Sequence, residues 1–317
     1  MSVTPNGGTP GSVRGSQAGA PAPARSWSRV ILDLDRRIIY GIVFLLVLIP
    51  LIRPLKLPIE QTDSVRKGYE MVENLKEGEA LLISVDFGPS TAPECQPVYV
   101  SLLHQCFRKG VRPIIVSLVP DGRGMAIRGL NIVRNGVDSA GQPHYPDLVD
   151  GEDYAFLGYK AGTLGPIVGM GQSFAATFPR DANNRPIGEL PLMRRFKKLG
   201  DCGAIFTVAA VGTPDYWLPY GSERYHVPMA VSCTAVSAAQ YSPYYISGQF
   251  VGLVNGMKGA AEYEAFVGLE QITGLPGDAT KGMDAQTMVH IFIVLAIILA
   301  NVALFAERRA SPRRRIA

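Results

Sequence analysis

The sequence predicts an α/β domain of the Rossmann-like, three-layer kind, with a mostly parallel sheet of about five strands, flanked by two transmembrane helices. Two observations support this prediction. Short apolar runs alternate with helical patterns through the middle of the chain, as in parallel sheets joined by right-handed crossovers. Long uncharged stretches lie near both ends of the 317-residue chain, which is 47% hydrophobic and only 18% charged.

The N-terminal region has three parts. Residues 1–25 are mainly Gly, Pro, Ser and Ala, so we expect a disordered cytoplasmic tail. Residues 26–37 place apolar side chains on one helical face, which is typical of an amphipathic juxtamembrane segment. Residues 38–55 form the first predicted transmembrane helix, although its uncharged part covers only about 22 Å of the roughly 30 Å hydrocarbon core. A buried helix of a soluble domain is the alternative.

The second predicted transmembrane helix covers residues 287–306 and is followed by a basic cytoplasmic tail over residues 307–317. Arginines flank both apolar stretches on their terminal sides, so the positive-inside rule places both termini in the cytoplasm. The α/β domain, residues 56–286, is then extracytoplasmic, and the protein belongs to the cell (inner) membrane. The net charge of +4 comes from these tails, so it does not indicate nucleic-acid binding.

Within the domain, periodicity predicts a helix over residues 64–75 and then a βαβ unit whose helix is closed by Gly110. The expected strands are residues 80–87, 113–119, 153–159, 204–211 and 229–233, with a further short strand possible over residues 127–134. The expected helices are residues 98–109, 167–178, 190–199 and a long final helix over residues 244–266.

Candidate ligand-binding residues follow from the rule that open parallel sheets bind ligands beyond the carboxyl ends of their strands. Arg123 also follows a strand in this way. The main candidates are Asp86, Ser90, Thr91, Glu94, Lys160, Asp215, Trp217, Ser232 and Thr234.

The most suggestive stretch is residues 86–94, where a strand ends in a small-residue loop that opens a helix. Backbone N–H groups at such a helix start attract anions, and Ser90 or Thr91 could add hydroxyl donors. The same two residues could instead cap the helix. The Gly-rich residues 162–171 fit neither phosphate-binding fingerprint, so the sequence predicts no cofactor.

The sequence predicts no metal site. The histidines do not have ligand spacing, and no C-x-x-C occurs. The four cysteines are expected to be free and buried, although an extracytoplasmic location permits disulfides.

Gly248, Gly252 and Gly256 recur every four residues in the predicted final helix. Such a stripe of glycines admits a close backbone, either from the domain's own sheet or from another subunit. The segment resembles the closing helix of membrane-anchored, Rossmann-like bacterial and archaeal proteins of uncharacterised function. The resemblance implies the fold and membrane anchoring, and no activity.

Two functions remain open. The first is a non-catalytic, membrane-anchored subunit that binds a small ligand or a protein partner in an envelope complex of transport or assembly type. Its partners would be the lipid bilayer and other membrane protein subunits or a second copy of the chain. The alternative is a membrane-anchored enzyme that uses the cleft at the strand ends, with Asp86, Ser90, Asp215 and Ser232 as its acids and hydroxyls.

Overall fold

The structure is a computed structural model that describes residues 27–138 and 140–310. The described residues divide into two compact parts, one formed by Ile42–Ile291 and the other by the described residues before and after this range. The predicted disordered tail, residues 1–25, lies outside the described residues, as does most of the basic C-terminal tail.

The larger part contains a six-stranded, all-parallel sheet with the strand order β3-β2-β1-β4-β5-β6. This arrangement confirms the Rossmann-like α/β class and adds one strand to the five predicted. The strands are β1 (Ala80–Asp86), β2 (Arg112–Ser117), β3 (Ala155–Tyr159), β4 (Ala204–Ala209), β5 (Met229–Cys233) and β6 (Gly252–Asn255).

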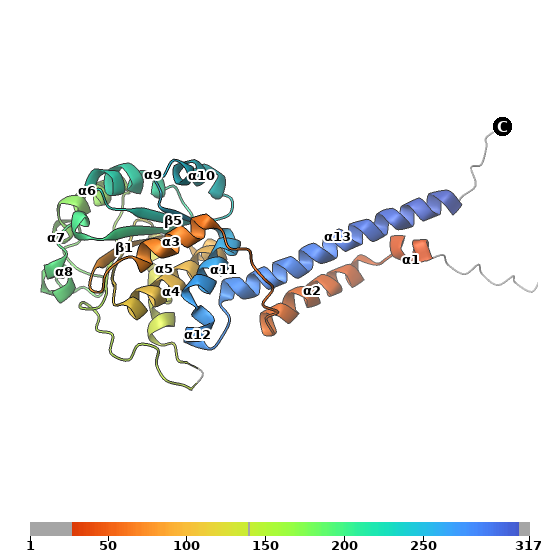
Figure 1. Ribbon diagram of the computed structural model, residues 1–317, viewed down its shortest axis with the longest axis horizontal. Helices are drawn as coiled ribbons and strands as arrows, with labels where there is room; N and C mark the ends of the chain where they lie inside the picture. The colour runs from red at the N-terminus through yellow and green to blue at the C-terminus, as the bar shows by residue number, and fades with distance from the viewer. Residues whose placement is uncertain (1–26, 139, 311–317) are drawn as a thin grey trace, which may run out of the picture. The chain divides into compact units, whose positions relative to one another are not determined.

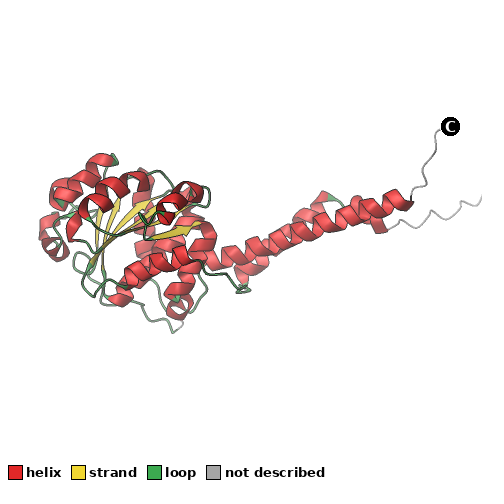
Figure 2. Cartoon of the chain, turned by 45° about the horizontal axis from the view of Figure 1, so that its top comes forward, coloured by secondary structure: helices red, strands yellow, loops and turns green. Residues whose placement is uncertain are grey.

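Helices cover both faces of the sheet, so every residue of β1, β4 and β5 is buried (Figures 1 and 2). The first face carries α3 (Asp63–Glu73), α4 (Ala92–Lys109), α5 (Pro120–Arg134) and α11 (Gly256–Val267). The second face carries α6 (Leu164–Gln172), α7 (Phe174–Thr177), α8 (Pro191–Arg195), α9 (Pro214–Trp217) and α10 (Ala238–Ile246).

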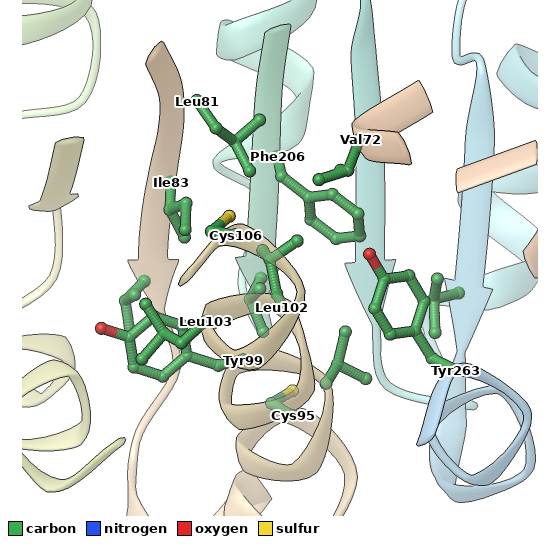
Figure 3. Packing of buried hydrophobic residues seen from close by; sticks show 14 of the residues in the cluster. Val72, Leu81, Ile83, Cys95, Tyr99, Leu102, Leu103, Cys106, Phe206 and Tyr263 are labelled. Carbon is green, nitrogen blue, oxygen red and sulfur yellow. The ribbon is translucent and has the colours of Figure 1, made fainter. Parts of the chain in front are cut away.

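The core of the first face forms where α4 crosses the middle of the sheet. Figure 3 shows Leu102 and Cys106 on α4, which lies in front of the central strands that carry Leu81 and Phe206, with Tyr263 of α11 to one side. Continuous aliphatic strands of this kind are typical of parallel sheets that are buried on both faces.

The strand order reverses between β1 and β4, because the chain moves outward from β1 to β3 and then returns to β4 on the other side. The loops after β1 and β4 therefore separate, and this switch point is where open α/β sheets bind ligands. The sheet edge that carries these loops is called the carboxyl edge below.

Two sequence predictions were wrong. The possible strand at residues 127–134 belongs to α5, which Pro120 begins and whose buried Ala126, Leu130 and Val133 have helical spacing. The predicted helix over residues 244–266 is instead α10, strand β6 and α11. The predicted helices over residues 167–178 and 190–199 are also shorter, the first being divided into α6 and α7.

The three glycines of the predicted stripe therefore have different roles. Gly248, at φ 80°, lies in the turn after α10, and Gly256, at φ 60°, begins α11. Gly252 lies in β6, where a Cβ atom would overlap the Cα and amide nitrogen of Gly68 in α3. The expected close backbone exists, and it belongs to the domain itself.

Among the described residues, one helix is long and apolar enough to cross a membrane by length and composition, and it is α13 (Asp278–Ala310). The sequence predicts two such helices. The other, α2 (Arg36–Ile52), has only 17 residues and contains Pro50. It follows α1 (Trp27–Leu32), and α12 (Leu269–Thr273) precedes α13.

Buried carboxylates fix the first turns of α13 within the larger compact part. Glu264 accepts hydrogen bonds from the backbone N–H groups of Ala279 and Thr280, both at 2.9 Å. Asp284 accepts from the backbone N–H groups of residues 55, 56 and 57 at 2.8, 2.9 and 3.0 Å. In the smaller part, Arg29 forms an ion pair with Glu307 at 2.8 Å.

Candidate functional site

Asp86 ends β1 directly below the switch point, and its side chain is fully buried. Its Oδ1 accepts a hydrogen bond from the Leu118 backbone N–H at 2.7 Å, and its Oδ2 accepts one from Ser84 Oγ at 2.6 Å. The buried Trp217 donates from Nε1 to the same Ser84 Oγ at 3.1 Å. Asp86 and Trp217, both predicted to bind ligand, therefore belong to one buried network that joins β1, α9 and the loop after β2.

We expect Asp86 to make the stability of the domain depend on pH. Burial raises the pKa of the Asp86 carboxyl above its ordinary value. As the pH rises above about 4, the unfolded chain releases this proton before the folded chain does, so stability is lost until the folded pKa is passed. Asp86→Asn removes the titration. The free energy of unfolding of the wild type, measured with urea, should therefore exceed that of Asp86→Asn by more at pH 4 than at pH 7. A difference between the two proteins that does not change with pH would contradict this assignment.

The loop after β1 does not present its hydroxyls as an anion site. Ser90 is exposed, and Thr91 Oγ1 donates to the Gly88 carbonyl at 3.2 Å. Neither side chain caps a helix. The Asp121 carboxylate lies beside this loop, since a Cβ atom on Gly88 would be 3.0 Å from Asp121 Oδ2. This negative charge would repel an incoming anion.

The candidates near β4 and β5 have partners within the domain or are buried. Glu94 Oε2 accepts from the Ala235 backbone N–H at 2.8 Å. Asp215 Oδ2 accepts from Gln240 Nε2 at 2.9 Å, and burial raises the pKa of this carboxyl. Thr234 Oγ1 contacts Ser237 Oγ at 3.2 Å within a turn. Ser232 is buried in β5, and its Oγ has no hydrogen-bond partner among the described residues.

Lys160 lines two open cavities, Arg123 lines one of these, and Glu94 lines a separate cavity with Ala235 and Asn255. One cavity of about 520 Å³ lies at the carboxyl end of β3 and is lined by Arg123, Lys160 and Arg180. A second, of about 450 Å³, shares Lys160 and extends along α6 to Thr177. We call the first the basic cavity.

The charge of the basic cavity is not neutralised. The side chains of Arg123 and Lys160 form no ion pair or hydrogen bond among the described residues. The only carboxylate in the cavity wall belongs to Asp181, which is bound to Arg185 Nη2 at 2.6 Å. The cavity therefore presents free cations to an incoming ligand, and an anion is the group that they would bind.

Sequence reasoning did not find Arg180. It lies in the loop after α7, and β3 is separated from it by the whole of α6 and α7. The Ala182 backbone N–H donates to the Phe156 carbonyl of β3 at 3.0 Å, and this hydrogen bond holds the loop against the strand. No local sequence pattern marks Arg180 as a residue of this cavity.

The described residues contain no group of three His, Cys, Asp or Glu side chains placed to hold a metal ion. All four cysteines are free and buried.

The fold and site define a Rossmann-like α/β protein with a basic cavity at the carboxyl edge of its sheet. No protein-family model matches the chain, and neither a curated protein nor a solved structure matches it.

Proposed function

We propose that the chain is a membrane-anchored, non-catalytic binding protein whose α/β domain holds a small anionic ligand in the basic cavity. The observation that carries this proposal is the pair of uncompensated cations, Arg123 and Lys160, in a cavity of about 520 Å³ at the carboxyl edge. A cavity of this size fits a phosphate- or carboxylate-bearing molecule. Such a ligand would link the protein to transport or assembly in an envelope complex.

Membrane anchoring is supported by α13, whose residues 288–306 carry no charge. We propose α2 as a second, shorter span. The Arg29–Glu307 ion pair joins the chain before α2 to the end of α13, and the hydrogen bonds of Asp284 join the chain after α2 to the start of α13. The arginines outside both helices favour cytoplasmic termini and an extracytoplasmic domain.

The enzyme alternative has less support. No hydrogen bond joins any two of Asp86, Ser90, Asp215 and Ser232, all of which lie within the described residues. Asp86 is enclosed in the sheet and Ser232 in β5, so neither reaches a substrate in the basic cavity. General acid–base catalysis needs groups within hydrogen-bond reach of the reacting atoms.

Titration calorimetry of the full chain in mild detergent tests the proposal, with inorganic phosphate, pyrophosphate and citrate as probes. We expect at least one probe to bind, and Lys160→Glu and Arg123→Glu each to weaken its binding about tenfold or more, since a charge-assisted hydrogen bond contributes about 1.5–3 kcal/mol. Lys76→Glu makes the same charge change at an exposed position in the loop that enters β1, at the opposite edge of the sheet, and should leave binding unchanged. Equal weakening by all three variants, or no binding of any probe, would refute the proposed site.

A further inference from the structure

The first turns of α13 run in the same direction as the strands. Because α11 follows the parallel strand β6, it returns from the carboxyl edge toward the other edge. Along α13, Ala279 contacts Glu264 near the end of α11, and Gly282 lies against Met257 near its start. The two helices are therefore antiparallel, and α13 leaves the domain past the carboxyl edge.

The apolar part of α13 begins at the level of this edge. Gln286 lines a cavity of about 450 Å³ together with Asn255 at the end of β6 and Ala235 after β5. The apolar run starts two residues later, at Met288, which is about 3 Å further along a helix that rises about 1.5 Å per residue. The headgroup layer adds only roughly 5–8 Å to each side of the hydrocarbon core. A membrane crossed by α13 would thus meet the carboxyl edge at headgroup depth.

The loops of the carboxyl edge expose aliphatic side chains at their tips. Leu164 after β3 is 41% exposed, Val211 after β4 is 45% exposed, and Val236 after β5 is 91% exposed. Tyr159 and Tyr216 are exposed on the same edge. Tyrosines and aliphatic side chains with nearby lysine or arginine are typical of surfaces in the membrane interface.

The opposite edge has a different character. The loops that enter β1, β4 and β5 expose Lys76, Glu77, Lys197, Lys198 and Arg224, with Ile246 as an exposed aliphatic exception before β6. The carboxyl edge thus exposes more aliphatic side chains than the opposite edge, and it is the edge past which α13 leaves the domain.

We propose that the carboxyl edge rests on the surface of the bilayer from which α13 emerges, with Leu164, Val211 and Val236 in the headgroup layer. The inference rests on the membrane anchoring proposed above. Lys160 and Arg123, which line the basic cavity at this edge, then lie near the headgroups. The bilayer is favoured over a protein partner because the apolar run of α13, in the same chain, begins at the level of this edge.

Fluorescence quenching by lipid tests the contact. The full chain carrying Val236→Cys is labelled with an environment-sensitive fluorophore and reconstituted into phosphatidylcholine–phosphatidylglycerol vesicles that contain a lipid quencher near the headgroups. The matched control is Lys197→Cys at the opposite edge, and the unlabelled parent accounts for the four buried cysteines. We expect emission from residue 236 to be blue-shifted and quenched several-fold more than emission from residue 197.

The outcomes separate the two proposals. If the protein does not float with the vesicles or is removed by alkaline carbonate, membrane anchoring is refuted, and the inference fails with it. If the protein is anchored but residues 236 and 197 are quenched equally, only the bilayer contact is refuted. If the label on residue 236 escapes quenching in the anchored protein, and the unlabelled Val236→Cys variant forms a disulfide dimer when copper–phenanthroline is added as oxidant, a second copy of the chain covers this edge and the bilayer does not.

Discussion

Gly252→Ala is expected to lower the free energy of unfolding of the α/β domain by about 3 kcal/mol, because a single methyl group would overlap backbone atoms of α3. The atoms that the new Cβ would meet are the Cα and amide nitrogen of Gly68 and the carbonyl carbon of Lys67. No side chain can rotate away from this contact. Either α3 must move off β6, or β6 must move away from β5.

The facing glycine provides the matched control. A Cβ atom on Gly68 would lie 3.7 Å from Gly252 Cα and from Val254 Cγ2, which is ordinary van der Waals contact. Gly68→Ala should therefore be tolerated, and it should stabilise α3 by up to about 1 kcal/mol through helix propensity. Urea unfolding in mild detergent, followed by the fluorescence of the buried Trp217, measures both variants. Equal stability of the two variants would contradict the close contact.

Asp284→Ala is expected to release the chain segment that follows α2 from the start of α13. The carboxylate is only 1% exposed and accepts hydrogen bonds from the backbone N–H groups of residues 55, 56 and 57. Alanine leaves these donors without their partner, and we expect a loss of about 3 kcal/mol, since one unsatisfied buried group costs about 1–3 kcal/mol. Limited proteolysis should then cut near residue 56, where the wild type resists.

Asp278→Ala is the control for this change. Asp278 lies in the first turn of the same helix, but its side chain is 86% exposed and forms an ion pair with the neighbouring Lys281. Its removal should alter neither proteolysis nor thermal unfolding measurably, because exposed ion pairs contribute little. Asp284→Asn keeps one acceptor oxygen and should fall between the two alanine variants. If Asp284→Ala resembles Asp278→Ala, the hydrogen bonds at residues 55–57 do not hold the segment.

The strands that sequence patterns predict well are those with long aliphatic runs. The runs at β1, β2, β4 and β5 are bounded by polar or glycine residues, and their ends were located within about two residues. Strand β6 has only four residues, Gly252–Asn255, and its glycine lies four positions from glycines on either side. That spacing imitates a helix face. The contact that distinguishes a strand from a helix at these residues is made with Gly68 of α3, which is far away in the sequence.

The candidate site was predicted in part for a related reason. Position at the end of a strand indicates which residues are near the carboxyl edge, and Lys160 was found in this way. It does not indicate whether a side chain points into the cavity or into the core. Asp86 and Trp217 point into the core, where Ser84 connects them. Arg180 reaches the cavity through a tertiary contact that has no local pattern.

The packing of α3 on β6 has a consequence for synthesis of the protein. Helix α3 precedes the first strand, yet the surface that it covers belongs to the last strand. A nascent chain that has reached only β5 therefore exposes both the apolar side of α3, with Val65 and Val72, and the unpaired edge of β5. Folding cannot finish until nearly the whole domain has been synthesised, and until then these two surfaces are open to aggregation.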